Sequence, residues 1–185
     1  FEKGQIHHAL HVAFAAMGNA LHHLGEFDKA KDYLDKASEI IKNFGNLPTS
    51  YLLSYYRFLI YLDENEIENA KRYAQKLEEI SVEIKEILGI GLSKLALGKI
   101  QGMETKGPSK LREAEKTILE GVEILKERSF KFFYPQGYLF LGELYADAGQ
   151  KAEAIEYLRM TESLYQEMGF VYWLDRTRAV LKRVS

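Results

Sequence analysis

Cysteine is absent from this chain of 185 residues, and proline occurs only three times. The lack of cysteine excludes disulfides, a thiolate nucleophile and zinc sites built on cysteine ligands. Because proline interrupts helix interiors, a chain with only Pro48, Pro108 and Pro135 keeps long stretches that can be helical. Both absences favour a helical protein without thiol chemistry.

The chain also lacks a strong charge of one sign and a long apolar run. Its 25 basic and 27 acidic side chains give a formal net charge of −2. Such a balance provides no basic field to hold a nucleic-acid backbone. No apolar run approaches the roughly 20 residues that span a membrane, and no secretion signal stands at the N-terminus. We therefore expect a cytoplasmic domain that contacts neither nucleic acid nor membrane.

Four similar segments recur along the chain, and this repeat is its most informative feature. They read GEFDKAKDYL, NEIENAKRYA, SKLREAEKTI and GQKAEAIEYL, starting at Gly25, Asn65, Ser109 and Gly149. Their aligned alanines, Ala30, Ala70, Ala114 and Ala154, are 40, 44 and 40 residues apart. A fixed period of this length is typical of solenoid folds, whose units pack on their neighbours and offer extended binding surfaces.

A second helical segment precedes each repeated segment, so that every repeat is predicted to be a pair of helices. In the first of these upstream segments the apolar residues recur at helical spacing, at Phe14, Met17, Leu21 and Leu24. The turns within repeats are expected at residues that tolerate left-handed backbone or start a turn. These are Gly25, Asn65, Gly107 and Gly149, and the connections between repeats are expected at Gly45, Lys85, Ser129 and Gly169.

The repeats are predicted to cover residues 5–44, 45–84, 85–128 and 129–168 of a single domain, residues 1–185. Residues 170–184 then form one more helix with an apolar stripe and a charged remainder. Terminal repeats need such a capping element, with one face for the core and one for solvent. The stripe consists of Phe170, Trp173, Leu174, Thr177, Val180, Leu181 and Val184. We expect the chain to be part of a longer protein.

Small residues occupy fixed places in both segments of a repeat. Gly18, Gly98 and Gly142 lie in the upstream segments, opposite the aligned alanines of the repeated segments. This pattern resembles the tetratricopeptide repeat family, and the 40-residue period resembles its longer-repeat branch in bacterial signalling ATPases and maltose-activator-like transcriptional regulators. The resemblance implies an all-α, right-handed superhelix of four helix pairs with a C-terminal capping helix.

The same resemblance implies a non-catalytic module that binds a peptide or protein segment in a concave groove, in bacterial signalling or transcriptional regulation. Two alternatives stay open. One is a sensor domain for a small effector or signal peptide, and the other is a self-association module that forms a homodimer through exposed repeat ends.

Family geometry places the groove along the first helix of each pair. Asn19 follows Gly18 as in family variants whose asparagine holds the backbone of a bound peptide. Ala15 stands where chaperone-binding members carry a lysine, which disfavours a terminal carboxylate as the ligand. The groove residues implied in this way are Asn19, His22, Tyr55, Leu59, Leu62, Leu95, Lys99, Met103, Leu139 and Glu143.

Histidine offers the one candidate metal signal, since all five histidines lie between His7 and His23. His7 and His11 are four residues apart and could share a helix face. Two imidazoles are fewer than the three or four ligands of a zinc site, and His22 lies too far along the helix to join them. Nothing places a nucleophile beside a base. We therefore expect no enzymatic activity, no metal and no cofactor.

Overall fold

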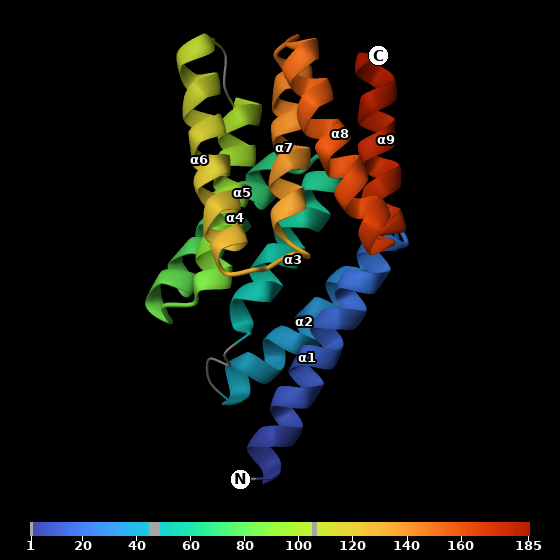
Figure 1. Ribbon diagram of the computed structural model, residues 1–185. Helices are drawn as coiled ribbons and strands as arrows, with labels where there is room; N and C mark the ends of the chain where they lie inside the picture. The colour runs from blue at the N-terminus through green and yellow to red at the C-terminus, as the bar shows by residue number, and fades with distance from the viewer. Residues whose placement is uncertain (1, 45–48, 105–106) are drawn as a thin grey trace. The chain divides into compact units, whose positions relative to one another are not determined.

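Helices account for the regular structure in the part of the chain that the computed structural model describes, residues 2–44, 49–104 and 107–185 (Figure 1). Their order and bounds are α1 Glu2–His23, α2 Phe27–Phe44, α3 Ser50–Asp63, α4 Ile67–Glu83, α5 Ile87–Glu104, α6 Pro108–Glu127, α7 Tyr134–Asp147, α8 Lys151–Met168 and α9 Val171–Val184. No strand occurs in these ranges. The predicted all-α fold of four helix pairs and one further helix is confirmed.

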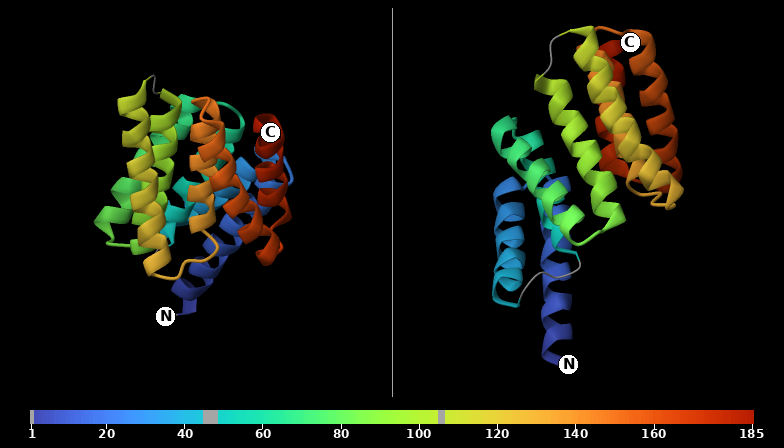
Figure 2. Two further views of the ribbon diagram at one scale, coloured as in Figure 1. Left: turned by 45° about the horizontal axis from the view of Figure 1, so that its top comes forward. Right: turned by 90° about the vertical axis from the view of Figure 1, so that its left-hand side faces the viewer.

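The helices group into two compact units, residues 1–89 and residues 90–185. In the first unit α1 packs on α2 and α3 packs on α4, and α3 also contacts α1 and α2. In the second unit α7 packs on α6 and α8, and α9 packs on α8 and α7. Figure 2 shows the paired helices running side by side within each unit.

Left-handed residues mark the ends of the helices where the sequence predicts turns. The backbone φ is 76° at Gly25, 59° at Asn65, 111° at Gly107 and 75° at Gly149. Lys85, Ser129 and Gly169 between the repeats also have positive φ, at 55°, 58° and 70°. Positive φ at a non-glycine residue is uncommon, so the repeat imposes one backbone path even where the residue is a lysine or a serine. Gly45 lies outside the described residues.

The second helix of each pair is amphipathic and buries a narrow stripe. α2 buries Ala30, Leu34 and Ala37, and α4 buries Ala70, Ala74 and Leu77 at the same spacing. This spacing of three and four residues keeps the side chains on one face of a helix. About half of the remaining positions of α2 and α4 carry charged residues, so the opposite face of each helix is polar.

The paired helices lie close together at the glycines of the first helix. A Cβ built on Gly18 would lie 2.7 Å from Leu34 Cδ2, and one on Gly98 would lie 2.5 Å from Ile118 Cγ1. At these distances the facing side chain would have to shift if a Cβ were added, so glycine allows the branched side chain of the second helix to lie directly against the first helix.

The capping helix is also confirmed. α9 buries Trp173, Thr177, Leu181 and Val184, four positions of the predicted stripe. The Tyr165 ring of α8 stacks on Trp173 with centroids 6.3 Å apart. Arg178 and Arg183 lie on the exposed side of α9. The helix therefore closes the apolar end of the fourth repeat.

One expectation about α1 is wrong. The apolar spacing that predicts α1 places Met17 on the core side, but Met17 is 47% exposed, and Leu24, directly after α1, is 73% exposed. Met17 aligns with Leu141 of α7, which is fully buried. Within residues 2–44, 49–104 and 107–185 no helix covers Met17 or Leu24 in this way.

Candidate partner-binding sites

The residues predicted to line a concave groove are mostly buried. Met103 is 39% exposed and Asn19 is partly buried. The other eight, His22, Tyr55, Leu59, Leu62, Leu95, Lys99, Leu139 and Glu143, are at most 7% exposed. The expectation that they form an open surface is therefore corrected, because their side chains are packed in this structure. Whether they take part in partner binding stays a prediction.

Leu95 illustrates why these positions are filled. A Cβ built on Gly121 would lie 2.8 Å from Leu95 Cδ2, and one on Gly137 would lie 2.9 Å from the same atom. Leu95 thus occupies the space that two glycines of α6 and α7 leave open. Close packing between helices therefore buries an apolar side chain that the sequence alone places in a groove.

Two of the predicted groove residues meet in a buried ion network of the second unit. Lys99 Nζ of α5 lies 2.8 Å from Glu143 Oε2 of α7, and Arg176 Nε of α9 lies 3.2 Å from Glu143 Oε1. Burial by itself raises the pKa of Glu143, but the charges of Lys99 and Arg176 outweigh it and hold this pKa below its usual value. The network joins the third repeat, the fourth repeat and the capping helix.

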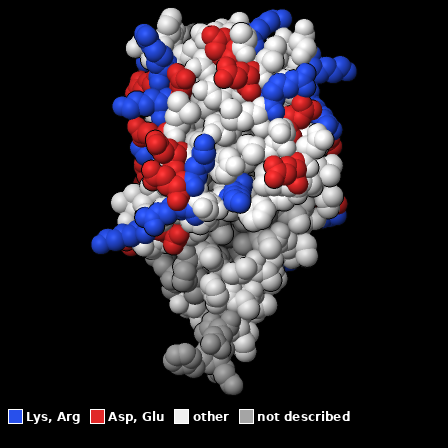
Figure 3. All heavy atoms as spheres, viewed as in Figure 1, with Lys and Arg blue, Asp and Glu red and all other residues white. Residues whose placement is uncertain are grey.

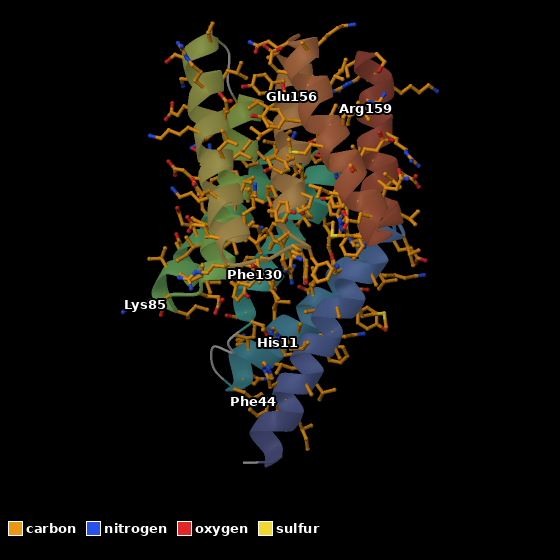
Figure 4. The ribbon with its side chains drawn as sticks, viewed as in Figure 1. His11, Phe44, Lys85, Phe130, Glu156 and Arg159 are labelled. Carbon is orange, nitrogen blue, oxygen red and sulfur yellow. The ribbon has the colours of Figure 1, made fainter. Side chains whose placement is uncertain are left out.

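The histidines of α1 have separate partners in the first unit. His22 Nε2 lies 2.7 Å from Asp63 Oδ2, and His11 Nε2 lies 3.1 Å from Thr49 Oγ1. His7 stacks on Phe44, whose helix end lies beside α1 (Figure 4). Among the residues that the structure describes, no group of three histidine, aspartate or glutamate side chains could hold a metal ion.

Burial also shapes the protonation of this cluster. It lowers the pKa of His11, and it lowers the pKa of His23 to about 4, with the neighbouring His22 adding to the effect. Both imidazoles are therefore neutral at pH 7. The histidines of α1 act as packing and hydrogen-bonding groups of the helix pair.

The first unit contains a pocket that the sequence analysis did not identify. It has a volume of about 440 Å³ and lies between α2, α3 and α4. Ser50, Leu53, Ser54 and Arg57 of α3 are buried and form its floor. The walls come from the flanking helices and comprise Asp35, Ser38, Ile41 and Lys42 of α2 with Tyr73, Lys76 and Ile80 of α4.

Arg57 is the central charged group of this pocket. Its Nη2 donates to Asp35 Oδ1 at 2.6 Å and to Ser38 Oγ at 3.3 Å. The guanidinium carbon lies 5.5 Å from the centre of the Tyr73 ring, a cation–π distance. Arg57 is 8% exposed, while the Asp35 side chain is 66% exposed. The guanidinium is therefore held in one orientation at the base of the pocket.

An alignment of the first helices would have revealed this floor. Ser50, Ser54 and Arg57 align with Tyr134, Tyr138 and Leu141 of the fourth repeat and with Leu10, Phe14 and Met17 of the first. In the second unit the tyrosines fill the corresponding groove, since Tyr138 stacks on Tyr157 of α8 with centroids 6.1 Å apart. The signal is three polar residues at positions where these repeats carry apolar or aromatic ones.

A second pocket, in the other unit, has a different character. It has a volume of about 350 Å³ and lies at the ends of α5, α6 and α7. Asp147 is its one charged lining residue among those described, and Arg183 Nη2 lies 2.8 Å from its Oδ1. The pocket therefore offers no converging set of charges.

No helix in the described ranges is long and apolar enough to cross a membrane. A search of curated proteins gave no match to the sequence. A family model described as tetratricopeptide repeat matches residues 12–44, in α1 and α2, and residues 135–159, in α7 and α8. The two matched segments and the all-helical pairs show that the chain is a tetratricopeptide-repeat protein.

Proposed function

We propose that this chain is a non-catalytic interaction module that binds a peptide or protein segment of a partner. Tetratricopeptide repeats generally mediate protein–protein interaction. The observation that carries the proposal is the α2–α3–α4 pocket, where one repeat keeps an accessible polar hollow at the place that another fills with tyrosines. Its volume falls in the range of ligand-binding pockets, about 300–1,000 Å³.

The setting we propose is bacterial signalling or transcriptional regulation in the cytoplasm. Its support is the 40-residue period, which resembles the longer-repeat branch of the family. In the second unit the buried side chains of Lys99, Glu143 and Arg176 form ion pairs with one another. These ion pairs link α5, α7 and α9, which suits a rigid scaffold for binding.

Selection from a random peptide library tests the proposal directly. The folded chain, immobilised, should enrich a sequence motif, and a synthetic peptide of that motif should bind in solution with saturable affinity. The chain unfolded in urea and immobilised in the same way is the control. If the folded chain enriches no motif beyond that control, while a small molecule binds it saturably, the effector-sensor alternative replaces the peptide-binding function.

The exposed face of α1 favours self-association as a second candidate function. Ile6, Leu10 and Met17 follow one stripe along α1, and Leu24 comes directly after its end; all four are between 41% and 73% exposed. Residues 5–24 contain no lysine, arginine, aspartate or glutamate, and outside the grey atoms Figure 3 shows no red or blue atoms over the narrow lower part of this face, where α1 lies. Contiguous apolar surface of this kind marks interaction sites.

Sedimentation of the chain over a range of concentrations tests this second candidate. A dimer that dissociates on dilution should become a monomer throughout in the Met17→Glu variant. Val82→Glu, a change at an exposed apolar residue of α4, is the matched control. A wild-type chain that stays monomeric at every concentration would exclude self-association.

A further inference from the structure

The floor of the α2–α3–α4 pocket contains polar groups that packing of the helices does not require. Ser50 is 4% exposed, and its Oγ has no hydrogen-bond partner among the described residues. Ser54 is 3% exposed and Arg57 is 8% exposed. A buried polar group without a partner costs roughly 1–3 kcal/mol, so a fold selected for stability alone would place apolar residues here. In α7 the aligned positions hold Tyr134, Tyr138 and Leu141, with no buried serine or arginine.

The charges around the pocket favour an anion. Lys42, Arg57 and Lys76 come from three different helices and face one carboxylate, that of Asp35. Neither Lys42 nor Lys76 has an ion-pair partner among the described residues. Asp35 binds Nη2 of Arg57 from the solvent side, where its own charge is hydrated. The pocket therefore retains an excess of positive charge and hydroxyl donors.

Resting on the proposed function, we infer that this pocket binds an anionic group of the partner segment, a phosphate or a carboxylate. Arginine recognises both groups through paired N–H donors, and lysines add mobile ammonium charges at the rim. The Ser50 hydroxyl supplies a further donor at the floor. Leu53, Ile41 and Ile80 line the remainder, so the apolar part of the same residue or its neighbour is also accommodated.

Titration of the ¹⁵N-labelled chain with sodium phosphate, and separately with sodium acetate, tests the pocket without knowledge of the partner. The backbone amides of Ser50 and Ser54 and the Arg57 Nε–H should shift and saturate, whereas sodium chloride at equal ionic strength should leave them unchanged. Saturation with phosphate alone would indicate a phosphate group on the partner segment, and saturation with both anions would indicate that the pocket accepts a carboxylate as well. Shifts that do not saturate with either anion would overturn the inference.

Variants that copy the fourth repeat test which residues of the pocket bind the anion. Arg57→Leu removes the cation, and Ser54→Tyr fills the pocket with the residue that stands at the aligned position. Each should weaken anion binding at least about 10-fold, the usual loss when a charged hydrogen bond disappears. Lys36→Ala on α2, outside the pocket, should retain it. Circular dichroism and the urea midpoint confirm that each variant is folded, and folded variants with undiminished binding would contradict the inference.

Peptides from libraries with a fixed central phosphoserine, glutamate or serine separate this inference from the proposed function. Tighter binding of the phosphoserine or glutamate peptides, lost in Arg57→Leu, supports both. A motif that binds wild type and Arg57→Leu equally would leave the interaction function standing and overturn the anion site. Saturable phosphate binding in the pocket without any selected peptide would support the site and contradict the peptide-binding function.

Discussion

Leu158 of α8 lies directly over Gly142 of α7, with its Cγ 2.5 Å from the place where a Cβ on that glycine would stand. Gly18 with Leu34 and Gly98 with Ile118 repeat the arrangement. In the second repeat the aligned residues are Phe58 of α3 and Ala74 of α4, both fully buried. Here the first helix carries the large side chain and the second helix the small one. Each pair of helices thus combines one large and one small residue at this crossing.

Replacing Gly142 by leucine should destabilise the protein by about 1–3 kcal/mol, because the new side chain has no room against Leu158. The free energy of unfolding in urea measures this loss. Ala152→Leu, on the exposed side of α8, should change it by no more than about 0.5 kcal/mol. Equal effects of the two substitutions would show that α7 does not present Gly142 to α8.

The double variant Gly142→Phe with Leu158→Ala copies the pair found in the second repeat. It should be less destabilised than the sum of its single variants, by at least about 1 kcal/mol, since contacting residues couple by roughly 0.5–3 kcal/mol. A double-mutant cycle of unfolding free energies gives this coupling. Simple additivity would mean that the Phe58–Ala74 pattern is not a compensating exchange of volume.

Glu143→Gln should lower stability at pH 7 by about 3–5 kcal/mol, because Lys99 and Arg176 would then lack their buried counter-charge. The pKa of Glu143 is lower in the folded than in the unfolded state, so its carboxylate stabilises the fold above about pH 4.5. That contribution is lost as the pH falls through the lower folded value. Urea unfolding from pH 7 to pH 3 should therefore show wild type and variant converging in acid, and a constant difference would disprove the role of ionised Glu143.

Tyr55→Ala should destabilise the protein by roughly 3–5 kcal/mol, as for other buried aromatic residues. Tyr55 is 1% exposed, and its ring lies 6.2 Å from that of Phe58. Thermal and urea unfolding measure the loss, with Met103→Ala as an exposed counterpart from the same predicted groove. If Tyr55→Ala left stability unchanged and abolished peptide binding, the original groove assignment would be correct.

His23→Gln should reduce the loss of stability in mild acid. Burial lowers the pKa of His23 from 6.5 to about 4, so the unfolded chain takes up this proton first as the pH falls. Stability is therefore complete above pH 6.5 and decreases as the pH falls toward 4. The unfolding free energy of wild type should drop faster than that of the variant across this window. Parallel curves would show that His23 titrates alike in both states.

The repeat made most of the fold predictable from sequence. The alignment of Ala30 with Ala70, Ala114 and Ala154 predicted the helix pairs, and glycine or asparagine between them predicted the turns, since few residues tolerate positive φ. The capping helix followed from its apolar stripe. The burial of Tyr55 and Leu95 was not predictable in this way. Helical periodicity tells which side of the helix a residue is on, but not whether another helix packs against that side.

By itself the sequence determined what depends on local order: the helices, their ends, the repeat and its family. Which of the residues on the first helices are accessible was decided by tertiary packing, since it depends on side chains 30 to 80 residues away, as for Lys99, Glu143 and Arg176. The pocket shows the difference most clearly. In the repeat alignment Ser50, Ser54 and Arg57 stand out only as polar residues at apolar positions, and the approach of α2 and α4 makes them the floor of a charged pocket.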